Sequence, residues 1–512
     1  MVREHLEIET KYDVAESFSL PVLDGLDGVE TVAEPTEHLL EAVYHDTHDL
    51  RLLRARVTLR RRTGGEDAGW HLKLPADAGR RELGAPLGRA QKKPPQALLG
   101  PVAGILRGAP TAPVATLRTQ RTVTSLRDEA GAQLVEIADD RVTASVPAPA
   151  PGEPAEVHTW HEVEVELGDG DRDRAASVAA ALAERLVAAG ARPAASASKV
   201  GRVLASRLGE FVPAGPATRK KGPRAGEFVQ AAFADQLAAL QAADVALRTA
   251  QPDAVHQVRV SSRRLRSTMA ALRSVLDRQV TDPLREELSW LGGQLSDARD
   301  DEVALAHLRE LVSAQPVELV LGPVAARLQQ TQLREEAAGL DRARDTLSDP
   351  RYLQLLDALH ELVAAPPFTG RAAEKAEPVL REAVDRSVRR LRRAMKVAED
   401  AAGHARSEAL HDVRKAAKRV RYATEIARPV VGGAKDVVGA AKEIQTVLGD
   451  AQDTVVTREL CRRLSLTAFA AGENAFTYGR LHALEEARAA RAEREFWAME
   501  ADLRRGLKAA GR

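Results

Sequence analysis

The sequence contains very little of several residue types. It has a single cysteine, Cys461, so it cannot form an intrachain disulfide or assemble a cysteine-based zinc site. Aromatic residues make up only 3% of the chain, so any core rests mainly on Ala, Val and Leu, which favours helices over a protein made wholly of strands. Lys plus Arg and Asp plus Glu each number 74. This balance excludes a uniformly basic coat for nucleic acid but not local basic patches.

Long apolar runs are also missing. The sequence has no stretch of about 18 uninterrupted apolar residues, which argues against a transmembrane helix. The first residues, MVREHLEIETKY, alternate charged with apolar side chains and lack the apolar core of a secretory signal. We therefore expect a cytoplasmic protein.

The first part of the chain, residues 1–209, has the pattern of an α+β domain. Apolar and polar residues alternate with period 2, as in half-buried strands, in residues 5–13, 56–62, 69–74, 119–126, 133–138 and 158–167. Helices are expected at residues 36–45 and 175–189. Turn-forming tracts, such as the Pro-rich residues 147–154, separate these segments.

The composition changes after residue 209. Residues 210–225 mix Pro, Gly, Lys and Arg with little periodicity and are interpreted as a linker. Residues 226–505 are rich in Ala, Leu and Arg with a period near 3.6, and their length suits about eight to ten helices. The predicted fold is therefore multidomain α+β, with an all-α C-terminal domain.

Two blocks of sequence recur within the helical part. HQVRVSSRRLRSTM, which begins at His256, matches HDVRKAAKRVRYAT, which begins at His411, at a fixed offset of 155 residues. LSDARDDEV from Leu295 matches LGDAQDTVV from Leu448 at an offset of 153 residues. Two matched blocks in the same order indicate a duplicated helical unit.

Charged residues gather on one face of several expected strands. Residues i, i+2 and i+4 of a strand point the same way. Residues that share a face in this way are Glu7, Glu9 and Lys11; Arg60 and Arg62; His71 and Lys73; Glu136 and Asp140; and Glu162, Glu164 and Glu166. One such strand usually has a solvated face. Acidic strands alternating with basic strands suit a cavity that holds Mg²⁺ or Mn²⁺ on hard oxygen ligands and a polyanion on Arg and Lys.

These strands resemble the CYTH domain, a family of triphosphate tunnel metalloenzymes. EIETK (Glu7, Glu9, Lys11) matches the ExExK signature of the family. Further matches follow in family order: YHDT at 44–47, LRRR at 59–62, WHLKLP at 70–75, QRTV near Arg121, VEIADD at 135–140, EVEVEL at 162–167 and SKVGR at 198–202. The resemblance implies a closed antiparallel β-barrel that forms a tunnel.

The resemblance also implies roles for individual residues. The triphosphate would be bound by Lys11, Arg60, Arg62, Lys73, Arg121 and Lys199. The divalent metal would be held by Glu7, Glu9, Glu162 and Glu164, and Glu136 and Asp140 would lie near a second metal or the attacking water. The expected catalytic residues are Glu7, Glu9, Lys11, Glu136 and Asp140. Arg118 lies three residues before Arg121, so period 2 places only one of them inside, and we favour Arg121. The tract RRELG at 80–84 fits the family pattern loosely and is given no role.

Basic residues form two stripes in the helical part. Helical spacing places His256, Arg259, Arg263 and Arg266 on one stripe, and the repeat places His411, Arg414, Lys418 and Arg421 on another. A solvated basic face explains either stripe alone, but the duplication of the histidine together with its cations favours a function. Two stripes on a shared groove would bind a linear phosphate polymer, whereas the scarcity of nearby aromatics makes single-stranded nucleic acid a weaker candidate.

This part resembles the CHAD domain, the conserved histidine α-helical domain that often follows CYTH. The matching blocks are VHQVRVSSRRLR at 255–266, LSDARDDEV at 295–303, LHDVRKAAKRVRY at 410–422 and LGDAQD at 448–453. The resemblance implies two pseudo-symmetric helical bundles that bind inorganic polyphosphate through the two stripes. Lys418 replaces an Arg of the first stripe, which retains charge but loses bidentate geometry. We expect Asp300 and Asp453 to orient basic side chains or cap helices.

The leading hypothesis is a protein that binds polyphosphate and hydrolyses tripolyphosphate with Mg²⁺ or Mn²⁺. The metal and the cationic side chains would neutralise the charge on the leaving phosphate while a metal-positioned water attacks. The alternatives are a non-catalytic polyphosphate-binding adaptor, associated with polyphosphate granules, and a nucleotide-acting enzyme: an adenylyl cyclase or a nucleoside or thiamine triphosphatase. The fold alone does not decide among them. No membrane or nucleic-acid partner is expected.

Overall fold

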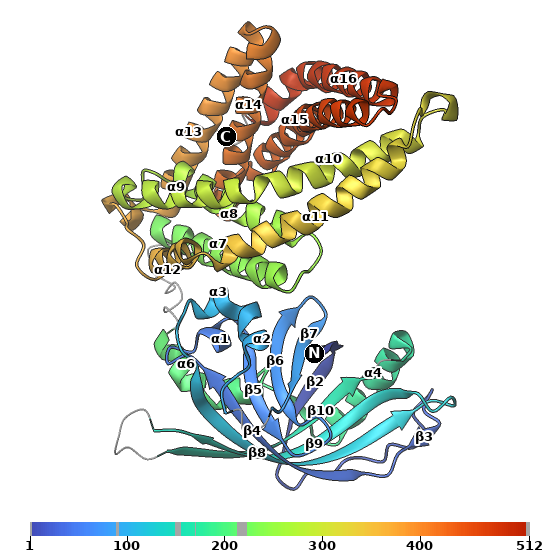
Figure 1. Ribbon diagram of the computed structural model, residues 1–512. Helices are drawn as coiled ribbons and strands as arrows, with labels where there is room; N and C mark the ends of the chain where they lie inside the picture. Colours follow the sequence, from blue (N-terminus) through green and yellow to red (C-terminus); the bar gives the residue numbers. More distant parts are fainter. Residues whose placement is uncertain (1–2, 89–91, 149–154, 169, 212–222, 508–512) are drawn as a thin grey trace. The chain divides into compact units, whose positions relative to one another are not determined.

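The computed structural model describes residues 3–88, 92–148, 155–168, 170–211 and 223–507 (Figure 1). The chain separates into two compact units, residues 1–213 and residues 214–512. Most of the tract expected to be a linker, residues 212–222, lies outside the described residues.

The first unit is built on one antiparallel sheet. Its strands are β1 (Arg3–Glu7), β2 (Glu9–Val14), β3 (Thr31–Val32), β4 (Thr36–Asp46), β5 (Thr58–Thr63), β6 (Gly69–Ala76), β7 (Gly79–Pro86), β8 (Ala112–Arg127), β9 (Gln133–Val146), β10 (Glu156–Leu167) and β11 (Arg192–Pro193). Their order in the sheet is β1-β7-β6-β5-β4-β8-β9-β10-β2-β11, and β3 pairs with β8. Only Ile8 separates β1 from β2, yet β1 pairs with β7 and β2 with β10. The sheet is therefore strongly curled, as Figure 1 shows, and forms an open half-barrel instead of the expected closed barrel.

Short helices complete this unit. They are α1 (Arg51–Arg54), α2 (Gln96–Leu99), η1 (Gly100–Val102), α3 (Ala103–Leu106), α4 (Arg172–Ala188), α5 (Lys199–Val203) and α6 (Ala205–Phe211). Helix α4, which the sequence predicted, covers the outer face of the sheet and packs Val178 and Leu182 against Val163 and Val165 of β10. Because those valines point outward, the alternation of β10 sends its glutamates to the inner face.

The expected helix at residues 36–45 is wrong, because this segment is strand β4. It lies between β5 and β8 and pairs with both. Leu40, Ala42 and Tyr44 are buried in alternation, so period 2 prevails over the helical spacing that Leu39, Leu40 and Val43 also allow. Strand β7, which contains the tract 80–84, was not predicted at all.

The second unit is helical, as expected. Its helices are α7 (Ala225–Arg248), α8 (Ala254–Ala271), α9 (Arg278–Gln294), α10 (Ser296–Ser313), η2 (Val317–Leu319), α11 (Val324–Ser348), α12 (Pro350–Ala364), η3 (Gly370–Ala373), α13 (Ala376–Asp400), α14 (Gly403–Ala427), α15 (Ala434–Ala470) and α16 (Phe476–Gly506). Its core is mostly Ala, Val and Leu, in keeping with the low aromatic content. Within the described part of the chain, no helix is both long enough and apolar enough to cross a membrane.

The repeated blocks lie on helices that contact each other. The first block is on α8 and α14, and the second begins α10 and recurs in α15. Helix α8 packs against α14, and α10 packs against α15. The duplication in sequence therefore places like segments side by side.

Gly79 offers a test of how the ends of the sheet are joined. It has a φ of +101°, and an added Cβ would overlap the backbone oxygen of Glu7. We expect Gly79→Ala to destabilise the protein by about 2–3 kcal/mol through backbone strain and the loss of β1–β7 pairing. Gly84, on the same strand, has open space around its Cβ position, so Gly84→Ala should change stability by less than about 0.5 kcal/mol. Chemical denaturation of the full chain measures both, and equal effects would contradict this account.

Candidate functional site

The inner face of the curled sheet lines a cavity of about 1280 Å³. Charged side chains of both signs reach it from β1, β2, β5, β6, β7, β8, β9 and β10 and from α5. All six residues predicted to bind triphosphate line it: Lys11, Arg60, Arg62, Lys73, Arg121 and Lys199. Side chains alternate between the two faces of each strand, so residues far apart in sequence reach the same cavity from neighbouring strands. Lys199 reaches it from the start of α5.

Most of these cations are already paired with carboxylates. Lys11 lies 3.1 Å from Glu9 and also pairs with Glu164. Lys73 pairs with Glu7, and its Nζ atom lies 3.4 Å from Glu82. Burial alone would raise the pKa of Glu9, and Glu164 repels it, but Lys11 and Lys73 lower that pKa overall. The cavity is thus an array of compensated charges.

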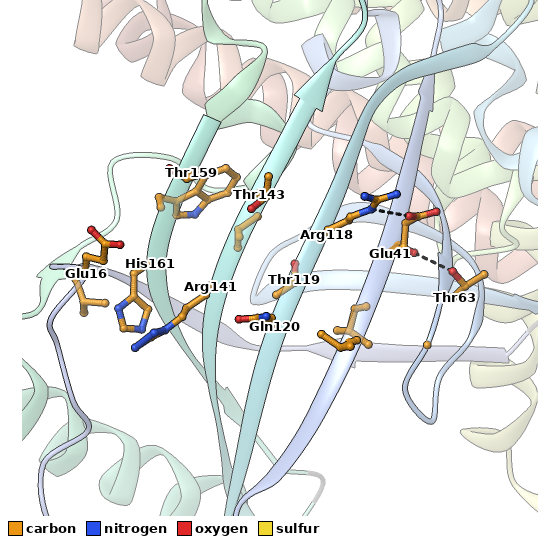
Figure 2. Close-up of a pocket in the computed structure, with 16 residues that line it drawn as sticks. Glu16, Glu41, Thr63, Arg118, Thr119, Gln120, Arg141, Thr143, Thr159 and His161 are labelled. Carbon is orange, nitrogen blue, oxygen red and sulfur yellow. Dashed lines mark hydrogen bonds and ion pairs between the residues drawn. The ribbon is translucent and has the colours of Figure 1, made fainter. Parts of the chain in front are cut away.

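The two arginines of β8 lie on opposite faces of the sheet. Arg121 points inward and binds Glu164 at 2.5 Å and Asp140 at 2.6 Å. Arg118 points outward, where its side chain is 77% exposed and donates to Glu41 at 2.9 Å. Figure 2 shows Arg118 and Glu41 beside an outer hollow of about 970 Å³, which is separate from the inner cavity. The placement that period 2 predicts for Arg121 is observed.

Lys199 anchors a buried charge cluster at the cavity wall. Its Nζ atom lies 2.9 Å from Asp140, 2.6 Å from Glu162 and 2.5 Å from Glu164. Burial alone would lower the pKa of Lys199, but these carboxylates raise it well above its usual value. A metal ion among them would have to displace the ammonium group. Asp140 and Glu162 do not line the cavity, but with Glu164 they form a buried group whose carboxylate oxygens lie close enough together to hold one metal ion.

A row of carboxylates crosses three strands inside the cavity. Glu166 of β10 lies opposite Glu9 of β2 on one side and Glu136 of β9 on the other, and all three line the cavity. Burial and repulsion from Glu7 raise the pKa of Glu166 to about 7. Among the described residues, Glu166 forms no ion pair. Hard oxygen donors with excess negative charge fit a divalent cation such as Mg²⁺ or Mn²⁺.

Glu166 and Glu82 are among the cavity residues to which sequence reasoning gave no role. Glu166 is the third glutamate of EVEVE, and its spacing was the available signal. Glu82 was missed because β7 was not recognised. It lies 2.6 Å from His71 Nδ1 and 3.8 Å from Arg60. Burial would raise the pKa of Glu82, but His71 and Lys73 hold it well below its usual range.

The two basic stripes of the helical unit meet where α8 packs against α14. All eight side chains are partly buried. Burial, together with the charges of Arg263 and Arg414, lowers the pKa of Lys418 to about 7, whereas Asp453 of α15 opposes this shift. Because Arg263 belongs to the other stripe, this electrostatic coupling shows that the stripes share one surface. The side chain of Asp300 lies outside the described residues.

The contrast between Arg121 and Arg118 gives a matched test of the buried charges. Arg121→Met leaves Asp140 and Glu164 undercompensated in a buried environment, so we expect a loss of about 3–5 kcal/mol of stability. Arg118→Met removes an exposed ion pair and should cost less than about 1 kcal/mol. The denaturation midpoints of the two variants measure this difference. If Arg121→Met costs no more stability than Arg118→Met, the inner cluster is not structurally important.

Comparison with known proteins agrees with this geometry. Two protein-family models match the chain, the CYTH domain over residues 5–190 and the CHAD domain over residues 231–462. The uncharacterized proteins Rv2226 and MT2285 of two Mycobacterium tuberculosis strains are each 39% identical over 513 residues, covering 99% of this chain and 97% of theirs.

Two solved structures also resemble parts of the chain. PptA from Streptomyces chartreusis has a TM-score of 0.45 and 21% identity, over 54% of this chain and 99% of that one. The CHAD domain from the plant Ricinus communis has a TM-score of 0.44 and 24% identity, over 58% of this chain and 96% of that one. By its two domain matches and its full-length relatives, the chain belongs to the family of proteins in which a CYTH domain is followed by a CHAD domain.

Proposed function

We propose that the protein is a divalent-metal-dependent triphosphatase that also binds inorganic polyphosphate. The CYTH domain hydrolyses tripolyphosphate or a related triphosphate, and the CHAD domain holds the polymer on its two stripes. The observation that carries the catalytic part is the carboxylate row Glu9, Glu136 and Glu166 beside the phosphate-binding cations.

The charge balance of the cavity supports a metal. Acidic and basic side chains line it in equal number, nine of each. A cavity without net charge does not by itself attract a polyanion strongly, whereas one loaded with divalent cations does. Binding of a polyanion alone would need no inward carboxylates. Their presence therefore favours a metal-dependent enzyme over a simple anion trap.

Glu7, Glu9, Glu136 and Glu166 would hold the metal. We propose this set in place of the pairing of Glu7 and Glu9 with Glu162 and Glu164 that the family resemblance implies, because Glu162 is already bound to Lys199. A divalent ion bound there supplies charge neutralisation and polarises a phosphoryl oxygen.

The cations of the cavity act by changing partners. In the free protein Lys11, Lys73 and Arg121 are held by carboxylates. When a triphosphate enters, its oxygens take the place of some of these carboxylates, so the cations stay compensated while they orient the substrate. The same groups then stabilise the charge that develops on the leaving phosphate.

Phosphate release from tripolyphosphate tests the catalytic proposal. Release should require Mg²⁺ or Mn²⁺ and stop with EDTA. Glu9→Gln and Glu166→Gln should lower the rate by about 10- to 100-fold and raise the metal concentration for half-maximal activity, because each removes a ligand.

Glu162→Gln separates the two metal assignments. It should lower stability without moving the metal requirement, and the opposite pattern would restore Glu162 as a ligand. No release by a protein that still retains polyphosphate would favour the adaptor. Faster turnover of ATP than of tripolyphosphate would favour a nucleotide enzyme.

Polyphosphate binding should depend on pH through Lys418. The groups around it are Arg259 and Arg263 of α8, Arg414 of its own helix and Asp453 of α15. A bound polyanion raises the lowered pKa of Lys418, so binding takes up a proton above pH 7. Affinity for long-chain polyphosphate should therefore be constant below about pH 7. Above pH 7 the affinity should fall as the pH rises. The total loss of affinity is about tenfold for each unit by which binding raises the pKa of Lys418.

Titration calorimetry in buffers of different ionisation enthalpy measures this proton uptake. Lys418→Arg, which keeps its charge, should flatten the pH profile. An unchanged profile in this variant would assign the dependence to another group.

A further inference from the structure

The two basic stripes end differently, although they derive from one repeat. The offset of 155 residues pairs Arg264 with Arg419 and Ala270 with Glu425. Arg264 lies 2.9 Å from Glu425 and sits over the ring of Tyr422. At this end the stripe is therefore neutralised by a carboxylate.

Arg421 strengthens that neutralisation. Its Nε donates to Glu425 at 3.0 Å and its Nη1 to Gln445 at 3.2 Å. One glutamate thus accepts hydrogen bonds from Arg264 and Arg421, and an incoming polyanion would meet its negative charge.

The opposite end has no equivalent acid. Ala270 occupies the position that corresponds to Glu425, and Arg419 forms no ion pair within the described part of the chain. Instead, Arg419 lies near enough to four other arginines to feel their charge, and the five together are here called the Arg419 cluster: Arg266, Arg273, Arg285, Arg390 and Arg419. Burial and the charges of Arg390 and Arg285 lower the pKa of Arg419 to about 10.

The contacts of the cluster leave most of its charge uncompensated. Arg273 and Arg285 share one carboxylate, Asp282, at 3.0 Å and 2.6 Å. Arg266 donates to the hydroxyl of Ser289 at 2.9 Å, which contributes no charge. Helices α8, α9, α13 and α14, which pack together, supply the cluster together with the loop that holds Arg273.

Such a group of like charges is unfavourable unless an anion joins it. Arg390 is exposed, so an anion can reach the cluster from solvent. Arg266 belongs both to the cluster and to the first stripe, which makes the two surfaces continuous. Within the part of the chain that the structure describes, the second stripe ends at Arg421, which contacts Glu425 and Gln445.

We propose that the Arg419 cluster is a further anion subsite that extends the polyphosphate surface at one end only. A phosphate chain bound along the stripes continues past Arg266 to Arg419 and Arg390, and stops at the other end where Glu425 lies. The inference rests on polyphosphate binding by the stripes and adds where the chain extends.

The repeat supplies a matched pair of variants for the test. In the full-length protein, Arg419→Gln combined with Arg390→Gln should weaken binding of long-chain polyphosphate about tenfold and make its salt dependence shallower, because fewer phosphates are contacted. Arg264→Gln removes one arginine at the corresponding position and should change affinity less than about twofold. Equal losses in both, or an unchanged affinity and salt slope in the double variant, would overturn the proposal.

Thermal unfolding gives an independent readout. Without added anion, the Arg419 and Arg390 variant should be at least as stable as the wild type, because repulsion is relieved, and polyphosphate should raise its midpoint by less than it raises that of the wild type. A lower midpoint with full protection by polyphosphate would make the cluster structural.

A variant of the stripes with charge removed at Arg259, Arg263, Arg414 and Lys418 tests polyphosphate binding by the stripes separately from the extension to the Arg419 cluster. If it keeps polyphosphate, the proposed binding function fails. If it loses polyphosphate and the cluster variant does not, only the extension fails.

Discussion

The CYTH unit depends on charges that are buried together. Lys199 alone contacts Asp140, Glu162 and Glu164, and Arg121 adds two further ion pairs to the same group. Burial of any one of these charges without its partners would cost several kcal/mol. The cluster therefore ties β8, β9 and β10 to α5 and fixes the inner face on which the cavity is built.

Under the proposed function, the two domains use opposite electrostatic arrangements for the same class of ligand. In the cavity each of Lys11, Lys73 and Arg121 has a carboxylate partner before substrate arrives, so binding is an exchange of partners and requires metal for net attraction. On the helical surface Lys418 lies among arginines and has a lowered pKa. The exchange suits a site where chemistry must follow binding, whereas a surface crowded with cations suits a site that only retains a polymer.

Much of this organisation could be predicted from the sequence, because strand alternation is a local property. Period 2 separated Arg121 from Arg118 and identified the charged faces of β2, β5 and β10. The segment of β4 was mistaken for a helix because its apolar residues fit both periods, and its pairing with β5 and β8 decides between them. Whether Glu162 or Glu166 is proposed as a metal ligand depends on cross-strand neighbours. Glu162 lies opposite Asp140 and beside Lys199, whereas Glu166 lies opposite Glu136. No single strand contains that information.

The duplication explains why one substitution can give the helical surface a direction. Polyphosphate is a uniform chain, so nothing in the ligand determines which way it extends from a two-fold arrangement of helices. A perfect repeat would bind it equally in both senses. The difference between Ala270 and Glu425 breaks this equivalence. Arg264 has Glu425 as a partner, whereas Ala270, at the position that corresponds to Glu425, offers no carboxylate to Arg419. The four arginines around Arg419 then reinforce the difference, since together they carry more positive charge than the one carboxylate of Asp282 compensates.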